Sequence, residues 1–83
     1  MANLENNPVD TRTFVQICAG LSKKEWVELQ GELAQKVKRT GQTIYYWRKG
    51  QKHPSSTLER VLISNHINKK YGITTKHWTL FPY

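Results

Sequence analysis

The sequence contains few of the residues that catalysis, metal binding or covalent cross-linking require. Its single cysteine, Cys18, cannot form an internal disulfide. Only six of the 83 residues are Asp or Glu, and five of these six lie within residues 1–35. No glycine-rich phosphate loop occurs, and the three histidines have no Cys or His partner at ligand spacing. We therefore expect no enzyme, no metal, and no cofactor or small-molecule ligand.

Long apolar runs are also missing. No stretch approaches the roughly 20 apolar residues that span a bilayer. The N-terminus, MANLENNPVD, is polar and acidic, unlike a signal peptide. With one unpaired cysteine and no secretion signal, we expect a cytoplasmic protein without membrane contact. A length of 83 residues fits a single small domain of modest stability.

Positive charge is concentrated in one part of the chain. Residues 1–35 hold three Lys or Arg against five Asp or Glu, a net charge of −2. Residues 36–83 hold ten Lys or Arg against one Glu, a net charge of +9. This asymmetry is typical of a protein that binds a polyanion, although a basic surface that serves solubility gives the same count.

Cap residues and apolar spacing predict helices rather than strands. Asp10 is the expected N-cap of the first helix, which ends at Gly20. Ser22 opens a capping box for a second helix that reaches about Arg39. Apolar residues repeat along this segment at helical spacing, and we favour one helix there over two although Gly31 lies inside it.

The third and fourth helices have equally clear end signals. The third is expected over Gly41–Lys49 behind the cap residue Thr40. The motif Ser56-Thr57-Leu58-Glu59 is a second capping box, and it starts a helix that reaches Tyr71. Together these helices predict an all-α fold, a small bundle of four to five helices.

The predicted domain occupies residues 10–73. Residues 1–9 are expected to be a flexible segment, and residues 74–83 a tail that packs on the fourth helix. One turn of this tail is expected to be capped by Thr74 or Thr75. The tail then folds back through its apolar residues Trp78, Leu80 and Phe81.

The fourth helix has apolar residues on two opposite sides. At 100° per residue, Leu58, Val61 and Leu62 form one stripe, which we assign to the core. The opposite stripe consists of Ile63, Ile67 and Tyr71. A surface helix needs only one such stripe, so the tail, a second subunit or both must cover the other. We therefore expect a homodimer through this helix and the tail, formed either in the free protein or only when it is bound to its target.

The third helix separates an apolar side from a polar one. Ile44 and Trp47 share one side and should hold the helix to the core. Gln42, on the opposite side, lies in the first turn, and its amide can pair bidentately with adenine. Tyr45 and Tyr46 suit phosphate hydrogen bonds or contact with a thymine methyl group, unless one of them packs on a neighbouring helix. Tyr46 fits base contact better because it follows Gln42 by one turn.

Residues 33–55, LAQKVKRTGQTIYYWRKGQKHPS, place apolar anchors, a cap and an exit in one register. The anchors are Leu33-Ala34, Val37, Ile44 and Trp47, the cap is Thr40, and the exit is Gly50 to Ser55. In this arrangement the chain resembles the phage-repressor-like helix-turn-helix family, the Cro/repressor or XRE type, over roughly residues 31–71. The turn departs from that family, which usually has glycine where Lys38 stands and an apolar residue where Arg39 stands. A left-handed non-glycine residue costs about 1–2 kcal/mol, so the angle between the two helices does not follow from the motif.

The resemblance implies a lambda-repressor-like domain that inserts the helix Gly41–Lys49 into the major groove of double-stranded DNA. The candidates for base contact are Gln42, Tyr46, Tyr45 and Gly41, the last through close approach of its backbone. The candidates for phosphate contact are Lys36, Lys38, Arg39, Thr40, Lys49, Lys52 and His53. If about five phosphates are neutralised, affinity should fall roughly 500-fold between about 50 and 200 mM salt.

The expected function is sequence-specific binding of double-stranded DNA by a transcriptional regulator of bacterial or phage origin. Two alternatives stay open. One is a protein-interaction module of the antitoxin or adaptor kind, and the other is a single-stranded nucleic-acid binder that stacks bases on Tyr45 and Tyr46. Neither the operator nor the choice between repression and activation follows from the sequence.

Overall fold

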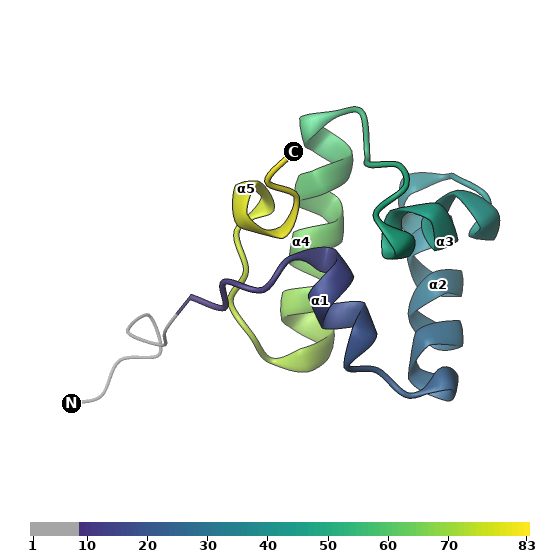
Figure 1. Ribbon diagram of the computed structural model, residues 1–83, viewed down its shortest axis with the longest axis horizontal. Coiled ribbons are helices and arrows are strands. Elements are labelled where there is room, and N and C mark those ends of the chain that lie inside the picture. Colours follow the sequence, from purple (N-terminus) through teal and green to yellow (C-terminus); the bar gives the residue numbers. More distant parts are fainter. Residues whose placement is uncertain (1–8) are drawn as a thin grey trace.

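The computed structural model describes residues 9–83. This range contains five α-helices joined by loops, and no strand. They are α1 (Phe14–Ala19), α2 (Lys23–Val37), α3 (Gly41–Lys49), α4 (Thr57–Tyr71) and α5 (His77–Leu80). Helix α2 lies against α4, α3 packs on α1 and α2, and α5 packs on α4 (Figure 1). The predicted all-α bundle is confirmed. The flexible segment predicted for residues 1–9 lies outside the described residues except at Val9.

One cluster of apolar side chains holds these helices together. Helix α3 contributes Ile44 and Trp47, and both point inward as predicted. Cys18 is fully buried in the same cluster, and burial raises the pKa of its thiol to about 12, so it packs as a small apolar residue. The other members are Phe14, Ile17, Trp26, Leu29, Leu33, Ile63, Ile67, Leu80 and Phe81. No helix within residues 9–83 is both long enough and apolar enough to cross a membrane.

Most helix ends follow the local signals in the sequence. The hydroxyls of Ser22 and Thr40 each accept a backbone hydrogen bond at the start of α2 and α3. Helix α2 continues unbroken through Gly31, which confirms one helix rather than two. Gly50 and Gly72 end α3 and α4 in the left-handed conformation, where glycine has no side chain to clash.

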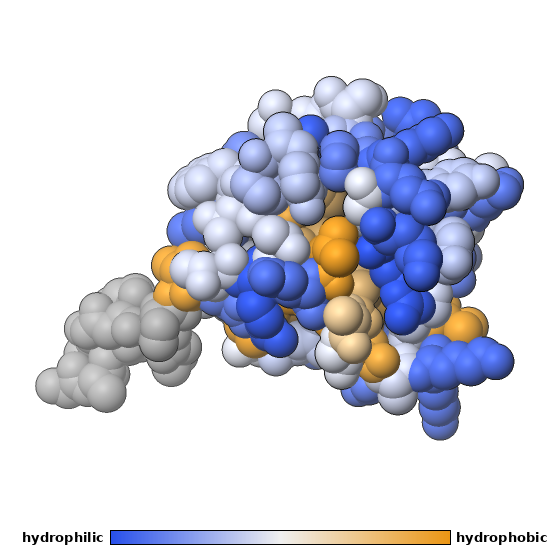
Figure 2. Space-filling view, viewed as in Figure 1, coloured by the Kyte–Doolittle hydropathy of each residue, from blue (hydrophilic) through white to orange (hydrophobic). Residues whose placement is uncertain are grey.

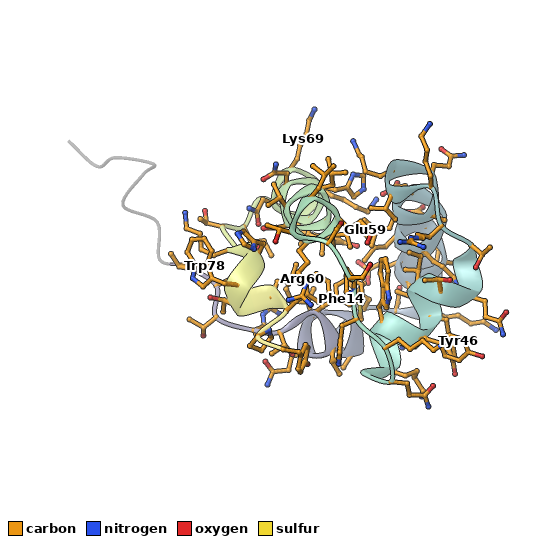
Figure 3. The ribbon with its side chains drawn as sticks, turned by 90° about the horizontal axis from the view of Figure 1, so that it is seen from above. Phe14, Tyr46, Glu59, Arg60, Lys69 and Trp78 are labelled. Atoms are coloured by element: carbon orange, nitrogen blue, oxygen red, sulfur yellow. The ribbon has the colours of Figure 1, made fainter. Side chains whose placement is uncertain are left out.

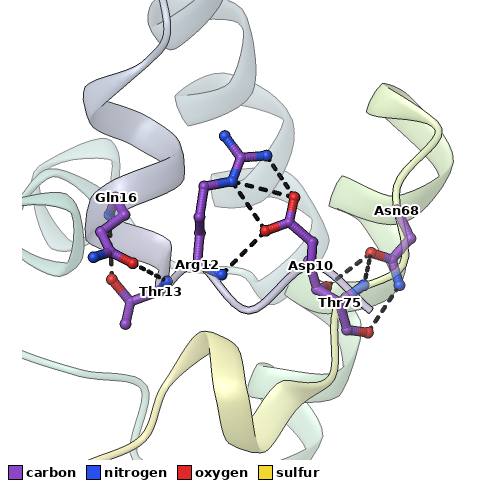
Figure 4. A network of polar contacts seen from close by, with 6 residues as sticks. All are labelled: Asp10, Arg12, Thr13, Gln16, Asn68 and Thr75. Atoms are coloured by element: carbon purple, nitrogen blue, oxygen red, sulfur yellow. Dashed lines mark hydrogen bonds and ion pairs between the residues drawn. The ribbon is translucent and has the colours of Figure 1, made fainter. Parts of the chain in front are cut away.

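The predicted start of α1 is wrong, because its N-cap is Thr13 and not Asp10. Figure 4 shows the reason. The Asp10 carboxylate accepts hydrogen bonds from the guanidinium of Arg12, at 2.6 Å for Nη2. The backbone N–H of Asp10 donates to the carbonyl of Thr74. Asp10 is therefore tied to the chain before α5. Thr13 and Gln16 instead form a reciprocal capping box.

The core-facing side of α4 is the opposite of the predicted one. Ile63 and Ile67 are 0% exposed, whereas Leu58 is 68% exposed. The inward side also contains Ser64, a polar residue that argues against burial when the sequence is considered alone. Its hydroxyl lies 2.8 Å from that of Thr75, so this buried polar group is satisfied by a residue of the tail.

The turn predicted to be capped by Thr74 or Thr75 begins instead behind Lys76, which makes no side-chain cap. Thr75 is buried, and its side chain and backbone are both engaged by Asn68 (Figure 4). Its N–H donates to the Asn68 side-chain oxygen at 2.7 Å, and the Asn68 amide donates to its carbonyl at 3.1 Å. These bonds fasten the segment between α4 and α5 to α4. Thr75 is thus an anchor rather than a cap.

Candidate nucleic-acid interface

Helices α2 and α3 are joined by three residues, Lys38 to Thr40. Lys38 takes the left-handed conformation, with φ 58° and ψ 46°, and is the only non-glycine residue among residues 9–83 with positive φ. Its N–H and that of Arg39 both donate to the carbonyl of Ala34, which closes the end of α2. Lysine therefore occupies a backbone conformation at this turn in which glycine is usually favoured.

A hydrogen bond across this turn fixes α3 relative to α2. The side-chain amide of Gln30 in α2 donates to the carbonyl of Gly41 in α3 at 2.7 Å. A Cβ at Gly41 would lie 3.4 Å from the Gln30 nitrogen, an ordinary contact distance, so the bond itself does not require glycine at this position. Sequence reasoning missed Gln30, because its partner is identified only once the two helices are placed.

The outward face of α3 carries three of the four candidates for base contact. The amide of Gln42 donates to the hydroxyl of Tyr46 at 3.0 Å, so the two act as one polar unit. Tyr45 lies beside them, 40% exposed, with its ring centroid 6.2 Å from that of Tyr46. Figure 3 shows Tyr46 on the outside of α3. Gly41, the fourth candidate, contacts Gln30 as described above.

Two lysines extend this face. The ammonium of Lys49 lies 5.8 Å from the ring centre of Tyr45, and that of Lys52, from the loop after α3, lies 5.2 Å from the ring centre of Tyr46. Each cation thus lies near a tyrosine ring, within the range of a cation–π contact. The loop is held to α3 because the N–H groups of Gln51 and Lys52 both donate to the Tyr46 carbonyl.

A hollow of about 250 Å³ lies between the turn, α3 and the loop that follows α3. Its lining includes three candidates for phosphate contact, Arg39, Lys52 and His53, and the hydroxyl residues Thr43 and Ser55. Thr40 borders α3 and is occupied as its cap, since its hydroxyl accepts from the N–H of Thr43. Residues distant in sequence therefore line one concave, basic surface.

Arg39 and Lys36 differ from the other cations. The Arg39 guanidinium donates through Nε to Glu59 at 2.7 Å, and this bond lowers the pKa of that carboxyl. Because Glu59 pairs with Arg39, the predicted capping box of α4 is only half formed: Ser56 accepts from the Glu59 N–H. Lys36 borders a different hollow with Glu32, Gln35 and His66, toward α4. The remaining candidates for phosphate contact are Lys38, Lys49, Lys52 and His53.

Hydrophilic residues cover most of the part of the molecular face in Figure 2 that lies over α2 and α3, apart from a small hydrophobic patch over α2, and hydrophobic side chains form a strip over α1. Within residues 9–83, no three His, Cys, Asp or Glu side chains gather as metal ligands would. Comparisons with protein-family models, with curated proteins and with solved structures find no match to this chain.

Proposed function

We propose that this protein binds double-stranded DNA with sequence preference, as a transcriptional regulator of bacterial or phage origin, by inserting α3 into the major groove. The observation that carries the proposal is the division of α3 into two sides. Ile44 and Trp47 are buried, while Gln42, Tyr45 and Tyr46 lie on its outward face, with a lysine near each tyrosine ring. Such a role belongs in the bacterial cytoplasm.

The dimensions of α3 suit this role. An α-helix with its side chains is about 10–12 Å in diameter and fits a major groove about 12 Å wide, and the nine residues of α3, at about 1.5 Å each, extend about 13.5 Å. The Gln42 amide can pair with adenine, and the tyrosines can contact a thymine methyl group or a phosphate. Lys38 before α3, Lys49 at its end and Lys52 in the loop after it provide cations for phosphates on both sides of the groove.

A salt titration with three nucleic acids tests the proposal. The protein is titrated with a selected-site duplex, a random duplex and a random single strand at several salt concentrations. With about four phosphate contacts, the log–log slope should be near −3.6, a loss of roughly 150-fold between about 50 and 200 mM salt. The selected duplex should bind most tightly. Binding without salt dependence, or equal affinity for random and selected duplexes, would contradict the proposal.

Single-stranded nucleic acid is the second candidate, because Tyr45 is exposed and lies close to Tyr46. Stacked bases would need open ring faces. The Tyr46 ring, however, has the Lys52 ammonium near it and its hydroxyl bonded by Gln42, which favours polar contacts over stacking. Equal affinity for the single strand and the random duplex would favour this candidate.

A homodimer on DNA remains part of the proposal, but through a different face of α4. Ile63 and Ile67 are buried, so they are not available to a partner. Leu58 and Trp78 are exposed, and Val61, one turn from Leu58, borders a hollow with Trp78. A single module has limited contact area on DNA, which favours two copies on adjacent half-sites.

Sedimentation with and without a palindromic duplex tests this assembly. The wild type should bind as two chains per duplex. Leu58→Asp, which alters only an exposed side chain, should bind as one chain while keeping its fold. One chain per palindrome in the wild type would exclude the dimer and leave Leu58 and Trp78 as isolated surface residues.

A further inference from the structure

Arg60, near the start of α4, joins two segments that are far apart in the sequence. Its Nε donates to the carbonyl of Pro54 at 3.0 Å. Its Nη1 donates to the carbonyls of Phe81 at 3.1 Å and Tyr83 at 2.9 Å. Figure 3 shows Arg60 between α4 and the chain after α5. One guanidinium therefore holds the loop after α3 beside the C-terminal segment, residues 81–83.

The C-terminal segment also contacts this loop through side chains. The ring of Tyr83 stacks on that of His53, with centroids 3.9 Å apart and planes inclined by 16°. Phe81 is fixed in the core against Phe14, with centroids 5.2 Å apart, so the segment starts from a rigid point. Pro54, which follows His53, is fully buried. The loop is thus held from the side opposite to its attachment on α3.

The same loop supplies two of the four remaining candidates for phosphate contact, Lys52 and His53. On the α3 side it is held by the two N–H bonds to the Tyr46 carbonyl. Without a second attachment, these two residues would have more conformational freedom to lose on binding, and ordering a segment on binding lowers affinity. Arg60 and Tyr83 supply that second attachment.

We infer that Arg60 and Tyr83 are positioning residues of the nucleic-acid interface, which hold residues 51–54 so that Lys52 and His53 face the phosphates. The inference rests on the proposed function, since it concerns the same surface. Neither residue has to touch DNA. Their effect is on affinity for every duplex and not on sequence preference, because the loop carries no candidate for base contact.

The test uses Tyr83→Ala, Tyr83→Phe and Arg60→Lys in the full chain. Tyr83→Ala removes the stacked ring, and Tyr83→Phe retains it. Arg60→Lys keeps the charge but replaces a forked guanidinium by a single ammonium. Val27→Ala is the control, because Val27 is an exposed apolar residue of α2 that belongs neither to the candidate interface nor to the dimer face.

Two measurements are made on each variant: the affinity for selected and random duplexes, and the heteronuclear NOE of the amides of residues 51–53 in the free protein. Tyr83→Ala and Arg60→Lys should lower both affinities by the same factor, up to about eightfold near 100 mM salt, which one contact contributes at a slope of about −0.9. Their loop amides should become more mobile. Tyr83→Phe and Val27→Ala should match the wild type in both measurements.

An unchanged affinity or an unchanged loop in both Tyr83→Ala and Arg60→Lys would overturn the inference and leave the proposed function intact, because the wild type would still bind duplex. A loss confined to the selected duplex would also overturn it, since positioning of phosphate contacts does not discriminate sequences. Failure of the wild type to bind any duplex would overturn the proposed function itself, and this inference with it.

Discussion

Lys38 is the residue at which folding stability and nucleic-acid binding should respond in opposite directions. Its backbone is left-handed, with φ 58° and ψ 46°, at the end of α2. Its side chain is exposed beside the start of α3. Lys38→Gly removes the cause of backbone strain and the charge together, while Lys38→Ala removes the charge and keeps a Cβ. The two variants therefore separate the two effects.

The magnitude for stability follows from the backbone. A left-handed residue with a Cβ costs about 1–2 kcal/mol, which glycine avoids. Glycine gives back about 0.4–1 kcal/mol through the larger conformational freedom of the unfolded chain. Lys38→Gly should therefore stabilise the fold by about 0.5–1 kcal/mol, which raises the Tm of a domain of this size by about 2–8 °C. Lys38→Ala should leave stability close to that of the wild type.

For binding, the two variants should behave alike. If Lys38 contacts a phosphate, each should flatten the log–log salt slope by about one unit and weaken all duplexes by the same factor. Urea unfolding and duplex titration at several salt concentrations provide the two readouts. Equal stability of Lys38→Gly and Lys38→Ala would refute the argument from backbone strain. An unchanged slope in both would show that the turn points away from DNA.

Further predictions concern the core, the polar face of α3 and the Arg39–Glu59 pair. Trp47→Ala should cost about 3–5 kcal/mol through a core cavity and unfold most of the protein, as circular dichroism would show; a stable, folded variant would contradict this. Gln42→Ala and Tyr46→Ala should keep the fold but lose about 1–3 kcal/mol of base discrimination in a selected-site assay. The loss in the double variant should be less than additive, because the two side chains are hydrogen-bonded to each other. Unaltered preferences would exclude α3 as the recognition helix. The hydrogen bond from Arg39 lowers the pKa of Glu59 below its ordinary 4.5, so the pair stabilises the fold above that pH, and this contribution is lost as pH falls through the lowered pKa. Glu59→Gln should therefore lose less stability than the wild type on acidification, as measured by urea unfolding. At neutral pH it should steepen the salt slope of duplex binding, because Arg39 is released. An unaltered acid response and an unaltered slope would contradict these two expectations.

Local signals in the sequence were sufficient for most helix boundaries. A cap hydroxyl and the backbone N–H that it binds are three residues apart, as at Ser22 and Thr40, so both partners are visible in one short stretch. The start of α1 could not be predicted in this way, because Asp10 and Thr13 are both good caps. The choice depends on Arg12 and on Thr74, whose carbonyl binds the Asp10 backbone from a distant part of the chain.

The orientation of α4 depended on a contact that helical periodicity does not contain. Each of the two apolar stripes has three residues, and the prediction assigned Leu58, Val61 and Leu62 to the core. The stripe that is buried also contains Ser64, whose hydroxyl needs a partner once it is buried. Thr75 provides the missing partner from beyond the end of α4, and Asn68 holds Thr75 in place. The inward side of α4 is thus determined by the tail as much as by the helix.

In the candidate interface too, some residues are placed by helical periodicity and others by tertiary contacts. The outward placement of Gln42, Tyr45 and Tyr46 follows from periodicity, because Ile44 and Trp47 leave them only one side of a short helix. The flanking cations depend instead on tertiary contacts. A count of charges treats Arg39 as free, whereas it pairs with Glu59 twenty residues later; the count likewise gives no sign that His53 stacks on Tyr83. The pairing of Arg39 reduces the expected number of phosphate contacts from about five to about four, and the expected effect of salt between about 50 and 200 mM from roughly 500-fold to roughly 150-fold. The salt slope therefore distinguishes the number of phosphate contacts expected from the charge count from the smaller number expected from the fold.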